Sequence, residues 1–101
     1  MKKKILRTHH YDASSYLRSD RECALYLGAA IDESDGDATL VIAALGDIAR
    51  ARGMMSLARE TGLTREGLYK ALSPDGNPSF ATVMKVCKAL GLKLHTEAVE
   101  A

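Results

Sequence analysis

The sequence has few aromatic residues and no tryptophan. Aromatic side chains make up 5% of the 101 residues, whereas apolar types together make up 47%. That apolar share excludes a globally disordered chain. The scarcity of rings predicts a core built from aliphatic side chains and methionine, and the length suits one domain with a modest core.

Long apolar runs are also missing. No stretch approaches the roughly 18 apolar residues that a membrane-spanning helix needs. The basic start Met1-Lys2-Lys3-Lys4 resembles the first part of a secretory signal, but Arg7 and the pair His9-His10 follow too soon for an apolar region to form. We therefore expect a cytoplasmic protein.

Cysteine is scarce, and its two copies lie far apart. Cys23 and Cys87 each fall within an apolar helical pattern, so buried, reduced thiols are expected rather than a disulfide or a metal site. His9-His10 and Asp12 could together hold a metal ion, but histidines near a chain terminus are more often solvated. We expect no metal and no cofactor.

Sets of catalytic residues are absent as well. The three histidines lie near the ends of the chain, and no Ser/His/Asp or Cys/His set has supporting residues around it. No glycine-rich loop that could hold a phosphate is present. The sequence therefore argues against an enzyme.

Apolar residues recur at helical spacing between capping and breaking residues, which predicts five helices. These cover about 20–33, 37–52, 55–61, 65–72 and the segment between Ser79 and Gly91. The pattern of Ser19 followed by Glu22 is typical of a capping box at the start of the first helix. The residues expected to face inward are Ala24, Leu27 and Ile31 on the first helix, Val41, Ala44, Leu45, Ile48 and Ala49 on the second, and Phe80, Val83, Met84, Cys87 and Leu90 on the fifth.

After the fifth helix, apolar and polar residues alternate over 92–96, which predicts a short strand. A lone strand cannot satisfy its own backbone, so it would pair with a second copy or with a partner. We therefore expect an irregular N-terminal segment over 1–18 and a single all-α domain over 19–101 that ends in this strand.

The third and fourth helices are separated by a glycine turn, a pattern typical of a DNA-binding helix-turn-helix. Gly62 suits the left-handed end of one helix, and Thr64 can cap the next. Such helix pairs are also common in all-helical proteins that do not bind DNA. A recognition helix, however, presents its first residues to the major groove, and here those residues are polar.

The chemistry of these residues fits a duplex. Arg65 can bond guanine, Glu66 can accept from cytosine, and Thr64 can bond a base edge or touch a thymine methyl. Tyr69 and Lys70 suit phosphate contacts. The residues that we expect to bind DNA are Ser56, Thr64, Arg65, Glu66, Tyr69, Lys70 and Asn77.

Charge is divided unevenly along the chain. Residues 12–49 carry two basic and eight acidic side chains, whereas residues 50–101 carry eight basic and five acidic ones. Because attraction to phosphates needs basic residues close to the duplex, the C-terminal half is the better candidate for binding DNA. An acidic segment is most often only a solvated surface.

Three segments carry a family resemblance: Ala44–Met54 (ALGDIARARGM), Arg65–Pro78 (REGLYKALSPDGNP) and Lys88–Leu92 (KALGL). With Tyr11-Asp12, they make about residues 10–97 closely resemble the probable addiction module antidote proteins, which are antitoxins with a lambda-repressor-like helix-turn-helix. The run LYKALSPDGNP is the specific part. Gly67 and the lysine-rich N-terminus depart from the family pattern.

The resemblance implies two roles. The protein would neutralise a small toxin encoded beside it, typically a basic ribonuclease that cuts mRNA, and it would repress their shared operon by binding a palindromic operator as a dimer. Because opposite charges guide association, we expect the toxin to contact the acidic N-terminal half. The candidate contacts are Tyr11, Asp12, Tyr16, Asp20, Glu22, Asp32 and Glu33.

Two other functions fit the same residues. A transcriptional regulator without a toxin would have an identical DNA site, so only the neighbouring gene or a pull-down of a bound toxin separates it from an antitoxin. A protein-interaction module that has lost DNA binding also fits, because Gly67 interrupts the expected recognition helix and the C-terminal half has only a modest basic excess.

Overall fold

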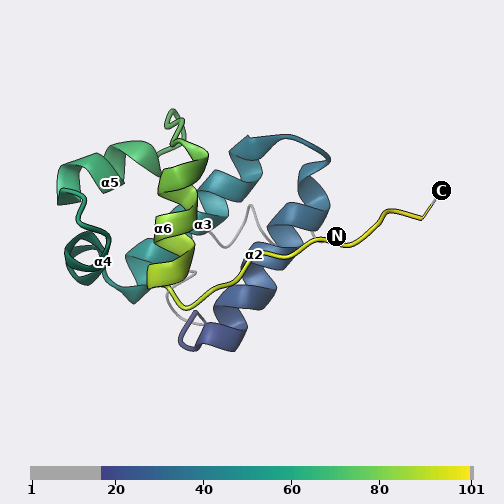
Figure 1. Ribbon diagram of the computed structural model, residues 1–101, viewed down its shortest axis with the longest axis horizontal. Coiled ribbons are helices and arrows are strands. Elements are labelled where there is room, and N and C mark those ends of the chain that lie inside the picture. Colours follow the sequence, from purple (N-terminus) through teal and green to yellow (C-terminus); the bar gives the residue numbers. More distant parts are fainter. Residues whose placement is uncertain (1–16, 101) are drawn as a thin grey trace.

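The computed structural model describes residues 17–100, which form five α-helices and no strand. The helices are α2 (Asp20–Ser34), α3 (Ala38–Arg52), α4 (Met54–Thr61), α5 (Arg65–Ala71) and α6 (Phe80–Ala89). Figure 1 shows α2 at one end of the molecule, α4 and α5 at the other, and α3 and α6 between them. The expected all-α fold is confirmed, and each helix begins and ends close to its expected residue.

Polar side chains cap the starts of all the described helices except α4, which begins after Gly53 without a side-chain cap. The Ser19 hydroxyl accepts from the backbone N–H of Glu22 at 3.1 Å, and the Glu22 carboxylate accepts from the N–H of Ser19 at 3.2 Å, which completes the expected capping box. Asp37 caps α3 and Ser79 caps α6. The helix boundaries are therefore encoded locally.

A buried carboxylate joins α2 to α3. Asp47 is only 6% exposed, and the Tyr26 hydroxyl donates to its Oδ2 at 2.6 Å while Arg50 donates to its Oδ1 at 3.0 Å. Both carboxylate oxygens thus have a partner, as a buried charge requires. A second link, from Arg52 to Asp20 at 2.8 Å, joins the end of α3 to the start of α2.

The inward face expected for α2 is largely wrong. Leu27 is buried, but Ala24 is exposed and Ile31 is 43% exposed. The buried side chains of α2 are Cys23, Tyr26, Leu27 and Ala30. Apolar residues lie on more than one side of this helix, so periodicity alone could not select the side on which Tyr26 reaches Asp47.

The face expected for α6 is also partly wrong. Cys87 and Leu90 are buried as expected, but Phe80 is 70% exposed and Met84 is 46% exposed. Val86 fills the core instead, with 0% of its surface exposed. On α3 the expected stripe is confirmed: Ala44, Leu45, Ile48 and Ala49 are buried and Val41 is half-buried.

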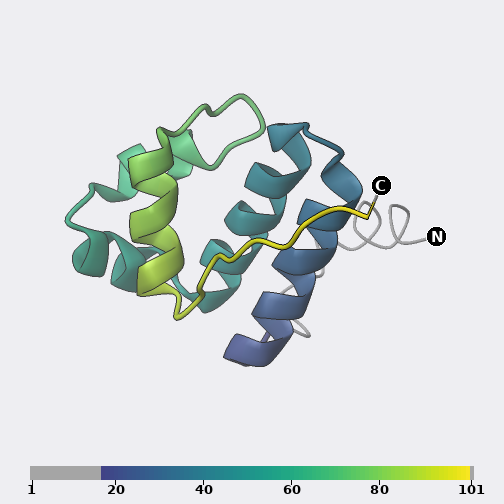
Figure 2. The same cartoon turned by 45° about the vertical axis from the view of Figure 1, so that its right-hand side comes forward.

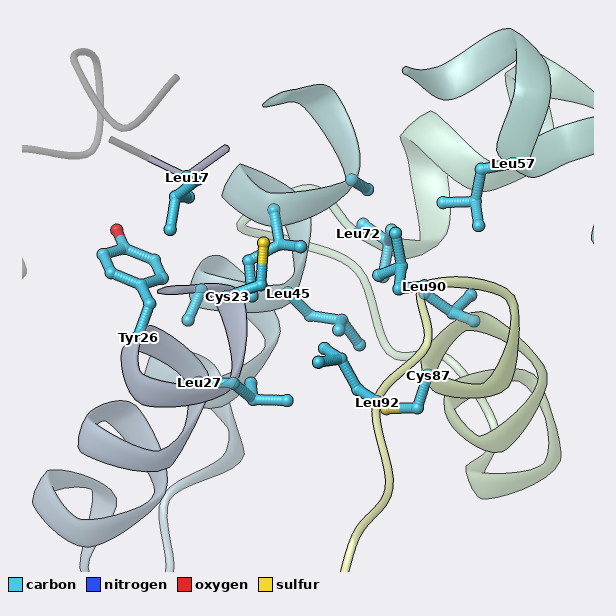
Figure 3. Close-up of a cluster of buried hydrophobic side chains, with 14 of the residues drawn as sticks. Leu17, Cys23, Tyr26, Leu27, Leu45, Leu57, Leu72, Cys87, Leu90 and Leu92 are labelled. Atoms are coloured by element: carbon cyan, nitrogen blue, oxygen red, sulfur yellow. The ribbon is translucent and has the colours of Figure 1, made fainter. Parts of the chain in front are cut away.

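The core draws on segments outside the helices. Leu17, which the sequence placed in the irregular N-terminal segment, is 2% exposed and packs with the core of α2 and α3 (Figure 3). Cys23 and Cys87 are buried and free, as expected, and burial raises the pKa of both thiols. No described helix has the length and apolar character to cross a membrane.

The strand expected over 92–96 is not formed in the described chain. Gly91, with φ of 77°, ends α6, and the Leu92 N–H donates to the Cys87 carbonyl at 2.8 Å in a Schellman arrangement. Leu92 then packs into the core, and Leu94 lies against it. The alternation therefore marks an extended segment with one side on the core. Figure 2 shows this segment passing from α6 across α3 towards α2.

Candidate nucleic-acid interface

A three-residue turn joins α4 to α5. Gly62 adopts the expected left-handed conformation, with φ of 77°, and its N–H donates to the Ala58 carbonyl at 3.0 Å. The Thr61 hydroxyl donates to the Leu57 carbonyl at 2.8 Å and accepts from the N–H of Leu63 at 3.3 Å. These bonds define the path of the chain between the two helices.

Thr64 caps α5, as the sequence predicts. Its hydroxyl oxygen accepts from the Gly67 N–H at 2.9 Å. Because the oxygen is used inside the helix end, the Thr64 O–H remains as a donor on an exposed residue. On the opposite side of α5, Leu68 and Leu72 are buried at 0% and 1% exposure and attach the helix to the core.

The polar side of α5 is open to solvent. Arg65, Glu66, Tyr69 and Lys70 are all exposed, and the Arg65 guanidinium lies over the Tyr69 ring at 5.6 Å from its centroid. This cation–π contact places the two side chains together, one helical turn apart. The exposed members of the predicted DNA-binding set are Ser56 on α4, Thr64, Arg65, Glu66, Tyr69 and Lys70 at α5, and Asn77 in the following loop.

Two glycines hold the carboxyl end of α5 by close backbone contacts. A Cβ on Gly46 of α3 would lie 2.7 Å from the carbonyl oxygen of Leu72. A Cβ on Gly76 would collide with the carbonyl groups of Ala71 and Lys70. Any larger residue would push the end of α5 away from α3 or from the loop, so both glycines fix where α5 lies. Both glycines lie within the segments that carry the family resemblance, but no local pattern predicts their contacts with α5.

The glycine at position 67 lies next to the cap of α5. A Cβ on Gly67 would lie 2.9 Å from the Thr64 hydroxyl oxygen, closer than side chains ordinarily approach. Gly67 is the third residue of α5, and a side chain there would require the Thr64 hydroxyl to shift.

The acidic residues predicted to bind a toxin have different surroundings. Asp20 is paired with Arg52, and Glu22 accepts from the backbone at the start of α2. Asp32 is exposed and Glu33 is half-buried at the other end of α2. Tyr11, Asp12 and Tyr16 lie outside the described residues, as do His9 and His10. Within residues 17–100, no group of three or more His, Cys, Asp and Glu side chains could hold a metal ion.

Comparison with known proteins identifies a family that this chain matches. A family model described as "Probable addiction module antidote protein" matches residues 7–98, a span that includes all the described helices. A Haemophilus influenzae protein described as "Uncharacterized protein" is 52% identical over 87 residues, which cover 86% of this chain and 88% of that protein. No solved structure matches the chain.

Proposed function

Because this chain belongs to the family of probable addiction module antidote proteins, we propose that it is an antitoxin that also represses the operon encoding it and its toxin. Family membership supports the antitoxin role and a toxin as partner. We take the toxin to be a ribonuclease that cuts mRNA, and the repressor to be a homodimer on a palindromic operator. The DNA-binding part of the proposal rests on the chain's own residues.

The observation that carries DNA binding is the two-sided character of α5. Its buried side anchors it through Leu68 and Leu72, while its leading residues extend into solvent. This is how a lambda-repressor-like recognition helix would present itself to a major groove. In this proposal Arg65 and Glu66 read bases, because a guanidinium pairs with guanine and a carboxylate accepts from cytosine.

The surrounding residues would position the helix on the duplex. Lys70 and Tyr69 would contact phosphates, and Ser56 and Asn77 would do so from α4 and from the loop after α5. The close contacts of Gly46 and Gly76 fix the other end of α5. A rigid placement matters because base readout depends on the register that the phosphate contacts set.

The test joins the two roles in one experiment. The chain is co-expressed with the open reading frame beside its gene, and growth, co-purification and binding to the DNA upstream of the pair are measured. We expect the partner alone to stop growth and the pair to restore it. We also expect the complex or the free antitoxin to bind the upstream DNA much more tightly than a scrambled duplex at the same salt concentration. A partner that neither inhibits growth nor co-purifies would contradict the antitoxin role.

A further inference from the structure

Several apolar residues of α2 are exposed to solvent. Leu25 is 61% exposed and Ile31 is 43% exposed, and Ala24 is also exposed. Gly28 lies between them along the helix, and a Cβ added there would meet nothing within 4 Å. We call Ala24, Leu25, Gly28 and Ile31 the outer α2 face.

This face is not part of the packing that holds α2 in place. The buried side chains of α2 are Cys23, Tyr26, Leu27 and Ala30, and Ala29 packs against the core beside them, whereas no member of the outer α2 face belongs to the core. Ala24, Gly28 and Ile31 recur three or four residues apart, so they form a stripe along the helix, and Leu25 lies beside it, three residues before Gly28. A grouped apolar surface on an exposed helix marks a contact with another molecule.

The charges around this stripe indicate which kind of partner would bind it. Asp32 and Asp35 are exposed at the carboxyl end of the stripe, with Glu33 beside them and Asp37 after the turn. Neither of the two ion pairs within residues 17–100 includes any of these four carboxylates. Within Asp20–Ser34, which the structure describes in full, the only basic side chain is that of Arg21, which is exposed at the other end of the helix. Because Asp37 already accepts from the Thr39 N–H as the cap of α3, Asp32, Glu33 and Asp35 are the carboxylates that favour a partner with a basic surface.

A second copy of this chain fits the stripe less well. Two copies would bring together two groups of unpaired carboxylates against few basic side chains. In addition, α2 and α5 lie at opposite ends of the molecule (Figure 1), so a dimer through α2 would direct its two α5 helices away from each other. One operator needs both recognition helices on one face of the duplex, about 34 Å apart or a multiple of that.

We propose that the outer α2 face is the docking surface for a basic, apolar-centred patch of the toxin. This inference rests on the proposed antitoxin function. The partner inserts apolar side chains beside Leu25 and Ile31, and the open position at Gly28 lets its backbone or a helix approach closely. The carboxylates of Asp32 and Asp35 meet its basic residues. Asp20 and Glu22 serve the fold instead, because each already has a partner within the chain.

The test measures binding of the purified product of the adjacent open reading frame to full-length variants. One variant carries Leu25→Ser and Ile31→Ser, and a second carries Asp32→Asn, Glu33→Gln and Asp35→Asn. The matched controls are Phe80→Ser with Met84→Ser, which removes exposed apolar groups from α6, and Glu60→Gln with Asp75→Asn and Glu97→Gln, which removes three carboxylates elsewhere.

We expect each α2 variant to weaken binding about tenfold or more, while the controls stay close to the unaltered chain. The carboxylate variant should lose mainly association rate, and its difference from the unaltered chain should shrink as salt rises. Its melting temperature should not fall, because carboxylates at the carboxyl end of a helix oppose the helix dipole. A purely structural role of these groups would lower the melting temperature.

Three results separate the possible failures. If the unaltered chain does not bind the product at all, the proposed function fails. If it binds and both α2 variants bind equally well, the docking surface is wrong and the antitoxin role stands. If the Leu25→Ser, Ile31→Ser variant instead turns a dimer into a monomer in light scattering and still binds the toxin, the occupant is a second copy and the inference is overturned.

Discussion

Gly46 is a residue whose importance lies in the backbone next to it. Its Cα sits so close to the Leu72 carbonyl that a Cβ would come within 2.7 Å of the oxygen. We expect Gly46→Ala to lower the free energy of unfolding by about 1–3 kcal/mol, because the extra methyl must displace packed backbone. Urea unfolding followed by circular dichroism measures the change.

Gly28 provides the control for this prediction. It also lies inside a helix, but a Cβ there meets open space. Gly28→Ala should therefore stabilise the protein by up to about 1 kcal/mol, the helix-propensity difference. Equal stabilities for the two alanine variants would show that the close contact at Gly46 has no energetic consequence.

Arg65 and Lys70 should differ in how they affect DNA binding. Both side chains are exposed on α5, but we assign Arg65 to a base and Lys70 to a phosphate. Arg65→Ala should cost about 1–3 kcal/mol on the operator and relax specificity at one base pair, whereas Lys70→Ala should weaken all sequences alike and reduce the salt slope by about one. Fluorescence anisotropy on cognate and scrambled duplexes at several salt concentrations measures both. Equal losses on the two duplexes for Arg65→Ala would contradict its assignment.

At the scale of single elements, the start of α3 gives a prediction about pH. The Asp37 carboxylate accepts the Thr39 N–H at 2.9 Å, and this hydrogen bond holds the pKa of Asp37 below its usual value. A carboxyl whose pKa is lowered by folding stabilises the protein above its unfolded-state pKa, and this contribution is lost as pH falls through the folded-state pKa.

The Asp37→Asn variant should therefore lose less stability than the unaltered chain between about pH 5 and pH 3, since asparagine caps a helix without titrating. Thermal unfolding across this range measures the difference. Asp75→Asn is the control, because Asp75 forms no helix cap and is exposed in the loop before α6. The prediction is wrong if the two variants follow the same curve.

The elements also differ in how far their sequence predicted them. Local chemistry predicted the Ser19 capping box, the left-handed Gly62 and the Thr64 cap, because each depends on residues within one turn. The inward faces of α2 and α6 were not predictable from periodicity, since Leu25, Ile31, Phe80 and Met84 add apolar positions on a second side. The alternation of apolar and polar residues at 92–96 was wrongly interpreted as a strand, because an extended segment with one side on the core has the same two-residue repeat.

The candidate DNA-binding site was likewise predictable only in part. The exposed residues of α5 followed from the position of its cap. The contacts that fix the carboxyl end of α5 could not be predicted in this way. Gly46 and Leu72 are 26 positions apart in the sequence, and no local pattern indicates that they are in contact. Gly76 stood within a recognisable turn, but its contact with the backbone of α5 needed the fold.

At the scale of the whole molecule, the two proposed binding surfaces lie at opposite ends. The helix α2, which carries the outer α2 face, is at one end and α5 is at the other (Figures 1 and 2). Toxin and operator should therefore bind at the same time rather than compete. A labelled operator duplex saturated with the antitoxin should shift to a larger complex when the toxin is added, as seen by gel mobility. Release of free DNA by the toxin would show that the two surfaces overlap or are coupled.

The shortness of α5 has a wider consequence. It contains seven residues, whereas isolated helices shorter than about 12–15 residues do not persist in water. The rest of the fold therefore holds α5 in its helical shape. A synthetic peptide of the same sequence would be a coil without affinity for a promoter. In the proposed repressor, a cellular protease that unfolds the domain by cutting elsewhere in it would therefore end transcriptional silencing without touching the residues assigned to the bases.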